Sequence, residues 1–284
     1  MKVLPECYVC ALRQVLAAAR LAGGDDFAIA CLKKASEILA QLPDGLTPPE
    51  MGEPIYRIVR EISGIRDPFS LQKKRQNEVV LALYPWLEER VKDSDDPLLT
   101  AMKLAIAGNA VDTGAQESFN LMKSISDALE KEGRYEAYEL FRSKLEDSKA
   151  ILYVADNCGE IVFDKLFIET IIRRLGAVEI ILAVRGGPII NDVTEAEAKD
   201  VGLGELCEII PTGMWMPGTL LEKTTEAFKR HFERADLVIS KGQGNWETLE
   251  ETDREIFFLL QAKCPVVARI NKCDEGNFLL LHKP

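Results

Sequence analysis

The second half of the chain alternates short apolar segments with helical ones, and no other feature constrains the fold as strongly. We predict strands at residues 151–155, 178–184, 208–211, 237–240 and 266–270. Between them we predict helices near residues 161–175, 195–201, 219–234 and 253–263. Strands that alternate with helices form a mostly parallel sheet with helices on both faces. The pattern therefore predicts an α/β, Rossmann-like fold, with residues 278–281 as a further edge strand.

The first half has a different pattern, in which apolar residues recur at helical spacing almost everywhere. Gly23 and Gly24 end the first predicted helix, and residues 42–45 break the next one. Thr47 is suited to cap the helix that follows, because prolines occupy its first turn. We therefore expect an all-helical N-terminal domain at 1–147 and an α/β domain at 148–284 that carries the functional site.

Composition limits the classes of partner. Hydrophobic residues make up 47% of the 284 residues and charged residues 29%, which is ordinary for a globular protein. The net charge of −11 argues against a nucleic-acid-binding surface, which needs clustered Lys and Arg. No apolar stretch approaches the roughly 20 residues of a membrane span, so we expect no membrane partner.

The N-terminal residues and the cysteines point to one compartment. The segment from Met1 to Cys7 lacks the apolar core of a signal peptide. The seven cysteines are scattered, without the framework of a small disulfide-stabilised scaffold. We therefore expect a cytoplasmic protein. The sequence leaves its oligomeric state open.

Polar side chains follow the predicted strands. Asp156 and Asn157 come directly after the first strand, Asp192 follows the second, and Lys241 follows the fourth. A parallel sheet brings the carboxyl ends of its strands to one edge, so these groups are expected to converge in a single cleft. Carboxylate and amide oxygens suit Mg²⁺ or Mn²⁺, while Lys241 and glycine N–H groups suit an anion such as phosphate.

Each of these residues also has a purely structural interpretation. Asp156, taken alone, is typical of a turn or a helix N-cap, and Asp192 with Thr194 is typical of helix capping. Glu160 is either a general base or a first-turn helix acid. The convergence of several loops at one edge favours the site over these separate interpretations.

Two further patterns remain open. Asn109 and Asp112 are three residues apart, so on a helix they would share a face, either as a structural hydrogen-bond network or as a roof over the cleft. Cys7 and Cys10 form a Cys-x-x-Cys motif at the start of a helix, either structural or able to bind a metal or react. With only two histidines, Ser-His-Asp or Cys-His catalysis is disfavoured.

The loops together resemble the metal-dependent damage-control phosphatases, a family first catalogued as a domain of unknown function, some members of which were described as acidic-residue methyltransferases. The resemblance lies in residues 156–164, 185–192 and 241–247, and in Cys7-x-x-Cys10 and Gly108-Asn109-x-x-Asp112, which are similar to the stand-alone, mainly archaeal branch. It extends from about Cys7 to Cys273.

This resemblance implies a set of roles. Asp156, Asn157 and Asp192 would bind a divalent cation (Mg²⁺, Mn²⁺, Co²⁺ or Ni²⁺), and Lys241 would contact the substrate phosphate. Asn109 would line the same pocket. Members hydrolyse phosphate esters of small damaged or overflow metabolites, such as sugar phosphates and phosphopantetheine derivatives. The family fold, an α/β sandwich with an added helical domain, agrees with the residue patterns.

The leading hypothesis is a metal-dependent phosphatase, in which Asp156 and Asp192 serve catalysis and Glu160 lies near the substrate. Attack by water and formation of an aspartyl-phosphate both remain open. One alternative is an S-adenosylmethionine-dependent carboxyl methyltransferase, although the first loop lacks the usual glycine-rich pattern. The other is a non-catalytic sensor in which Cys7 and Cys10 hold a metal.

Overall fold

A computed structural model describes residues 1–108, 117–130 and 133–284. Its strands are β1 (Ala150–Val154), β2 (Glu179–Val184), β3 (Glu208–Pro211), β4 (Leu237–Lys241), β5 (Ile256–Gln261) and β6 (Phe278–Lys283). Its α-helices are α1 (Pro5–Leu39), α2 (Pro48–Ser63), α3 (Ser70–Lys92), α4 (Pro97–Ala107), α5 (Glu117–Glu130), α6 (Tyr138–Glu146), α7 (Glu160–Leu175), α8 (Glu195–Asp200), α9 (Glu226–Arg234), α10 (Gln243–Leu249) and α11 (Pro265–Ile270).

The strands form one six-stranded sheet in the order β3-β2-β1-β4-β5-β6. The first five run parallel, and β6 pairs antiparallel with β5, so the predicted edge strand is confirmed. In β1, Tyr153 lies between Leu182 of β2 and Ile239 of β4. The strand order reverses beside β1, and in doubly wound folds ligands bind at such a switch point. The predicted mostly parallel α/β sheet is confirmed.

Side chains alternate between the two faces of the sheet, and each face has its own hydrophobic core. Ile151 and Tyr153 point into the core built with α3, α4, α6 and α7. Leu152 and Val154 point into the core built with α9, α10 and α11. The first core joins helices on both sides of residue 147, so α3, α4 and α6 pack on the sheet itself. The predicted boundary at 147/148 stays a prediction.

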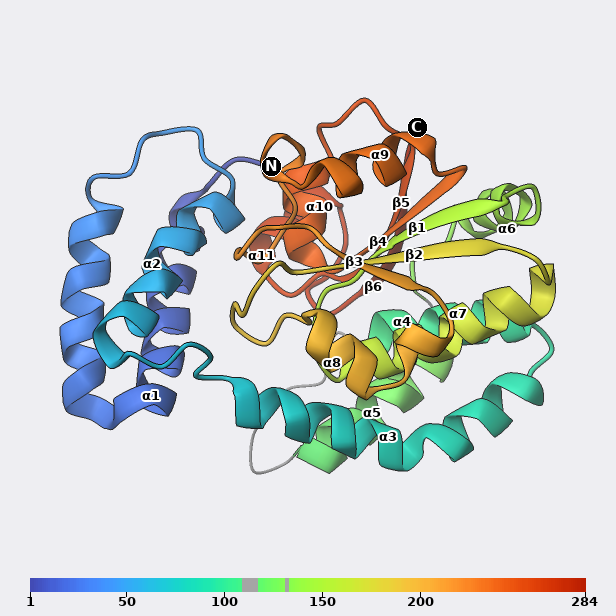
Figure 1. Cartoon of the computed structure of the whole chain (residues 1–284), viewed down its shortest axis with the longest axis horizontal. Coiled ribbons are helices and arrows are strands. Elements are labelled where there is room, and N and C mark those ends of the chain that lie inside the picture. Colours follow the sequence, from blue (N-terminus) through green and yellow to red (C-terminus); the bar gives the residue numbers. More distant parts are fainter. Residues whose placement is uncertain (109–116, 131–132) are drawn as a thin grey trace.

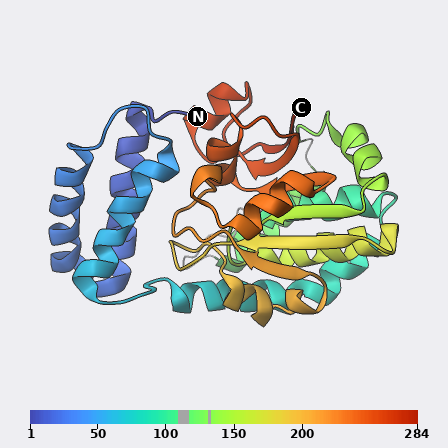
Figure 2. The same ribbon diagram turned by 45° about the horizontal axis from the view of Figure 1, so that its top comes forward.

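Helices α1 and α2 form a separate pair with a core of their own. Gly24 interrupts α1 with a φ of 78°, where the sequence pattern ended the first helix. Thr47 caps α2 in a capping box with Glu50, as its position suggested. Figures 1 and 2 show this pair beside the sheet, at the end where the strands lead into the helices. Contacts of α2 with α10 and of Arg60 with the Pro188 carbonyl hold it there.

Two predicted elements were wrong. Residues 256–261, expected within a helix, form β5, and residues 266–270, expected to be a strand, lie in α11. The run Ile-Phe-Phe-Leu-Leu is buried on both faces, and such a run has no periodicity that separates a strand from a helix. Pro265 instead occupies the first turn of α11, a position that proline favours.

Two helix boundaries also differ from the prediction. In the predicted helix at 219–234, only Glu226–Arg234 is α-helical, because Thr225 caps α9 by accepting a hydrogen bond from the Phe228 N–H. The segment after β4, expected to be a loop, forms the short helix α10. Among the described residues, no helix combines the length and the hydropathy needed to cross a membrane.

Candidate functional site

The loops after β1 and β2 are bound to each other along their backbones. The Val193 N–H donates to the Asp156 carbonyl at 2.9 Å, and the Cys158 N–H donates to the Asn191 carbonyl at 2.8 Å. Asn157 and Asp192 form an isolated antiparallel bridge. These bonds hold Asp156, Asn157 and Asp192 side by side at the carboxyl edge of the sheet, as the sequence predicted for their position. Their roles stay predictions.

Arg185 lies between the two aspartates. Its Nε donates to Asp192 Oδ2 at 2.6 Å and its Nη2 to Asp156 Oδ1 at 3.3 Å. The side chain is 1% exposed, and its Nη1 donates to Thr219 Oγ1, Asn245 Oδ1 and the Gly218 carbonyl. A bound guanidinium of this kind fixes the orientation of both carboxylates.

Glu160 and Asn157 extend this arrangement towards α7. The Asn157 amide nitrogen donates to Asp156 Oδ2 at 2.6 Å and to Glu160 Oε2 at 3.4 Å. Gly159 makes the turn into α7 with a φ of 78°, and its N–H donates to Asn77 Oδ1 at 2.6 Å. A single short turn therefore places Asp156, Asn157 and Glu160 together.

Lys241 is fully buried beneath these residues, and all three of its N–H donors are in use. Its Nζ donates to Glu160 Oε1 at 2.6 Å, to Asp164 Oδ1 at 2.6 Å and to the Ala105 carbonyl at 2.9 Å. In this arrangement Lys241 has no donor left for a substrate phosphate. Its contact with phosphate, implied by the family resemblance, stays a prediction.

The buried cluster carries more negative than positive charge. Four carboxylates (Asp156, Glu160, Asp164 and Asp192) face two cations (Lys241 and Arg185), so with all four ionised the cluster has an excess of two negative charges. Burial, together with the carboxylates of Asp192 and Glu160, raises the pKa of Asp156 to about 7. Burial also raises the pKa of Asp192, and it raises that of Asp164 to about 6. Ionised carboxylates here call for a further cation.

Within the described ranges, no group of three or more His, Cys, Asp or Glu side chains is arranged to hold a metal ion. Asp156 and Asp192 supply two carboxylates, so a further protein ligand drawn from the described residues would be another kind of oxygen. The amide of Asn157 is the adjacent candidate, because none of the described residues donates a hydrogen bond to its Oδ1. The donor set thus fits a hard divalent cation that keeps several of its waters.

Gly242 packs directly against Asp156. A Cβ on Gly242 would lie 1.9 Å from Asp156 Oδ2, and the glycine has a φ of +78°. We expect Gly242→Ala to displace the carboxylate and to abolish most metal-dependent turnover. Gly276→Ala is the matched control, because Gly276 has a φ of +92° but nothing within 4 Å of its Cβ. Alanine in the left-handed backbone conformation should destabilise both variants by roughly 1–2 kcal/mol. Only in Gly242→Ala does the new Cβ also clash with Asp156.

The comparison is made on phosphate release and on the melting temperature of both variants. Equal loss of activity in the two would show that backbone strain, and not contact with Asp156, sets the effect.

Three buried residues of the site were not singled out from the sequence: Arg185, Asn245 and Asp164. Asn245 is fully buried, and its Nδ2 donates to the carbonyls of Ala155 and Lys241, so it joins the ends of β1 and β4. A signal for Arg185 was present, since an arginine directly after a buried strand precedes two glycines and lies seven residues before Asp192. Asn245 carried no such signal within its motif.

Asn109 and Asp112 lie outside the described residues. The residue before Asn109, Gly108, packs tightly against α7. A Cβ on Gly108 would lie 2.6 Å from the Phe163 ring and 3.2 Å from the Glu160 Cα. The chain therefore leaves α4 directly beside Glu160.

The Cys7-x-x-Cys10 motif lies in the first turns of α1, as predicted, near the thiol of Cys264 and the carboxylate of Glu247. Burial and these neighbours raise the pKa of both thiols, so they favour the protonated form. Gln243 bridges the neighbours, because its Nε2 donates to Glu247 Oε1 at 2.8 Å and lies 3.6 Å from Cys264 Sγ. The metal-bearing sensor hypothesis gains no support from this geometry.

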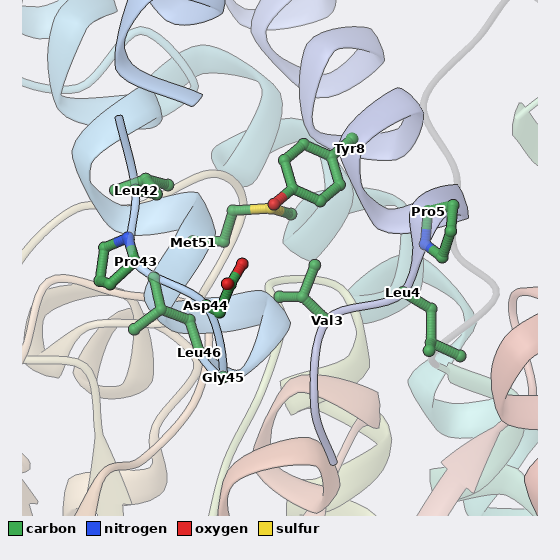
Figure 3. Close-up of a pocket in the computed structure, with 10 residues that line it drawn as sticks. All are labelled: Val3, Leu4, Pro5, Tyr8, Leu42, Pro43, Asp44, Gly45, Leu46 and Met51. Atoms are coloured by element: carbon green, nitrogen blue, oxygen red, sulfur yellow. The ribbon is translucent and has the colours of Figure 1, made fainter. Parts of the chain in front are cut away.

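A cavity of about 510 Å³ lies between the N-terminal segment and the loop before α2 (Figure 3). Its lining consists of Val3, Leu4, Pro5, Tyr8, Leu42, Pro43, Asp44, Gly45, Leu46 and Met51. None of these side chains is cationic and one is a carboxylate, so the cavity does not suit a phosphate.

The model of the damage-control phosphatase ARMT1-like domain matches residues 3–279. Damage-control phosphatases of Pyrococcus horikoshii and Archaeoglobus fulgidus are 34% and 33% identical, over 99% and 98% of this chain and 98% of each relative. A solved structure of a DUF89 family protein from P. horikoshii superposes with a TM-score of 0.90 at 33% identity and covers all of both chains. The mouse 4'-phosphopantetheine phosphatase is 29% identical over 56% of this chain and 21% of its own length.

Proposed function

The chain belongs to the damage-control phosphatase ARMT1-like domain family, and from this premise we propose that it is a metal-dependent phosphatase acting on phosphate monoesters of small metabolites. One observation carries the proposal at the level of chemistry. The buried carboxylates Asp156 and Asp192 lie side by side at the switch point of the sheet, in a cluster of four carboxylates and two cations.

A divalent cation fits this cluster. Asp156, Asp192 and the Asn157 amide oxygen would hold it, with water completing the coordination, an oxygen set that suits Mg²⁺ and extends to Mn²⁺, Co²⁺ or Ni²⁺. When bound, the cation supplies Lewis-acid polarisation of the phosphoryl group and offsets its charge. Its positive charge would also keep Asp156 ionised, against the burial that raises the pKa of this carboxyl to about 7.

The protein's own residues do the positioning. Arg185 holds one oxygen of each aspartate, and the Asn157 amide donates to the other oxygen of Asp156. Lys241 holds Glu160 Oε1, so the other oxygen of Glu160 faces Asn157. Glu160 is thereby placed to orient the side chain that lies beside Asp156. Preorganised groups of this kind lower the cost of reorganisation in the transition state.

The substrate class follows from the relatives. One of them is named for 4'-phosphopantetheine, so we propose phosphopantetheine derivatives and sugar phosphates as the first substrates to examine. All seven cysteines are free thiols, which fits a reducing compartment, and we propose the cytoplasm. No specific observation favours the methyltransferase hypothesis.

The test is release of inorganic phosphate from p-nitrophenyl phosphate, sugar phosphates and 4'-phosphopantetheine. Chelator-stripped protein should be inactive, and Mg²⁺, Mn²⁺, Co²⁺ or Ni²⁺ added back singly should restore turnover. The stripped protein is followed by circular dichroism, so that loss of metal is separated from loss of fold. Folded protein without turnover on any ester with any of the four metals would refute the proposal.

A further inference from the structure

Two arginines from the helical pair lie against one tryptophan of the α/β layer. The guanidinium carbon of Arg60, in α2, is 4.8 Å from the centroid of the Trp215 ring. That of Arg66, in the link from α2 to α3, is 5.5 Å from the same ring. Trp215 itself lies in the loop after β3 and is half-buried. Two segments that are distant in sequence, residues 60–66 and the loop of Trp215, thus converge on one indole.

This cluster adjoins the loop that carries Asp192. Arg60 Nη1 donates to the Pro188 carbonyl at 2.8 Å, four residues before Asp192. Gly187 packs against the indole so closely that a Cβ there would lie 1.9 Å from the Trp215 ring. Tyr56, one helical turn before Arg60, is near enough to Asp192 to feel the charge of its carboxylate. Arg60 therefore lies on the face of α2 that borders Asp192, and Arg66 follows just after the end of that helix.

Neither the Arg60 nor the Arg66 guanidinium forms an ion pair with a carboxylate of the described residues, although the chain carries a net charge of −11. Glu53, Glu61 and Asp67 do lie near enough to Arg60 to act on its charge. Asp67 is the adjacent acid, and its carboxylate is already bonded to Lys73 Nζ at 3.0 Å and to the Phe69 N–H at 3.0 Å. Arg57, on the same helix, does form ion pairs. Its Nη1 lies 3.6 Å from Glu53 Oε1 and its Nε lies 3.4 Å from Glu61 Oε1.

We propose that Arg60, Arg66 and Trp215 form a subsite for a second anionic group of the substrate, a carboxylate or a second phosphate. This rests on the proposed function, in which the phosphate to be hydrolysed lies at Asp156 and Asp192. A guanidinium is planar and binds oxyanions through paired N–H groups, and its contact with an indole fixes its orientation. The preferred substrates would then be phosphate monoesters that carry another acid at their far end.

A structural role would account for the same contacts in another way, as a clamp between α2 and the loops of the sheet. The two roles differ in what they change. A clamp affects thermal stability and all substrates alike, whereas a subsite affects the choice between substrates that differ only in the second anion.

The experiment compares 6-phosphogluconate with sorbitol 6-phosphate, which differ only by a carboxylate in place of a terminal hydroxymethyl group. We expect the kcat/KM of the wild-type protein to be at least tenfold higher for 6-phosphogluconate than for sorbitol 6-phosphate, because its KM for 6-phosphogluconate is lower. Arg60→Ala and Arg66→Ala should each reduce that preference at least fivefold. Arg57→Ala is the matched control, one turn away on α2, and should leave the preference unchanged.

Calorimetric binding on chelator-treated protein separates this proposal from the proposed function. If no ester is hydrolysed, tighter binding of 6-phosphogluconate than of sorbitol 6-phosphate, lost in Arg60→Ala, still supports the subsite. Equal binding of the two compounds by the wild-type protein overturns it, whatever the enzyme hydrolyses. Equal loss for both compounds in Arg60→Ala, with a lowered melting temperature, would establish the clamp instead.

Discussion

Replacing Asp156 by asparagine should abolish metal-dependent hydrolysis while leaving the fold intact. The variant removes a charged ligand from the proposed cation site, and a metal ion supplies several kcal/mol of transition-state stabilisation, which corresponds to about a thousandfold or more in rate. Stability should not fall, because the ionised carboxylate is costly in the metal-free protein: burial and the charges of Asp192 and Glu160 raise its pKa to about 7. The measurements are phosphate release with added metal and the melting temperature without it.

Asp200→Asn serves as the control for Asp156→Asn. Asp200 is exposed at the end of α8, so its replacement should change neither phosphate release nor the melting temperature. Metal-dependent turnover retained at the wild-type rate in Asp156→Asn would remove Asp156 from the site. A large fall in its metal-free melting temperature would show that Asp156 is needed chiefly for folding.

Replacing Lys241 by methionine should destabilise the protein by about 3–5 kcal/mol, because it leaves buried charge without a partner. Lys241 Nζ is bonded to Glu160 and Asp164, and all three side chains are fully buried. Asp164 already has one buried oxygen, Oδ2, without a hydrogen bond. Urea unfolding at neutral pH measures the loss, and turnover should fall with it because Glu160 loses its anchor.

A compensating variant tests this interpretation. In Lys241→Met, the further changes Glu160→Gln and Asp164→Asn remove the orphaned charges and should restore much of the stability, although not the activity. Lys199→Met is the surface control, since Lys199 is exposed and paired with Glu195, and it should cost less than about 1 kcal/mol. A lysine that contacted phosphate without a structural role would show loss of activity with unchanged stability.

The elements with the clearest patterns were predicted from sequence to within a residue or two. The first four strands and the helix after β1 are of this kind, because each is a short apolar run or a helical repeat bounded by glycine or polar residues. Asp156 and Asp192 could be placed at one edge for a similar reason, since a parallel sheet gathers all its carboxyl ends. The elements at residues 256–270 were predicted wrongly, because the strand β5 and the helix α11 are both short apolar runs.

The partners of the charged residues were beyond the sequence. The resemblance implied that Lys241 contacts phosphate, and nothing in the sequence indicated that its Nζ is bonded to Glu160, Asp164 and a carbonyl of α4. Glu160 precedes Lys241 by 81 residues, and nothing local in either segment indicates their contact. The ion pairs of Arg185 likewise could not be predicted, because they form only when the loops after β1 and β2 pair and place Asp156 and Asp192 against it.

The sequence by itself determined the α/β architecture, the order of its polar loops and the family. Periodicity and motif spacing are local properties, so they can be read along the chain. Only the tertiary structure decided which helices cover the sheet, which cation neutralises which carboxylate, and that α2 brings Arg60 onto Trp215 beside the site. Those outcomes depend on contacts between segments far apart in the chain, where packing and the cost of burying charge select the partner.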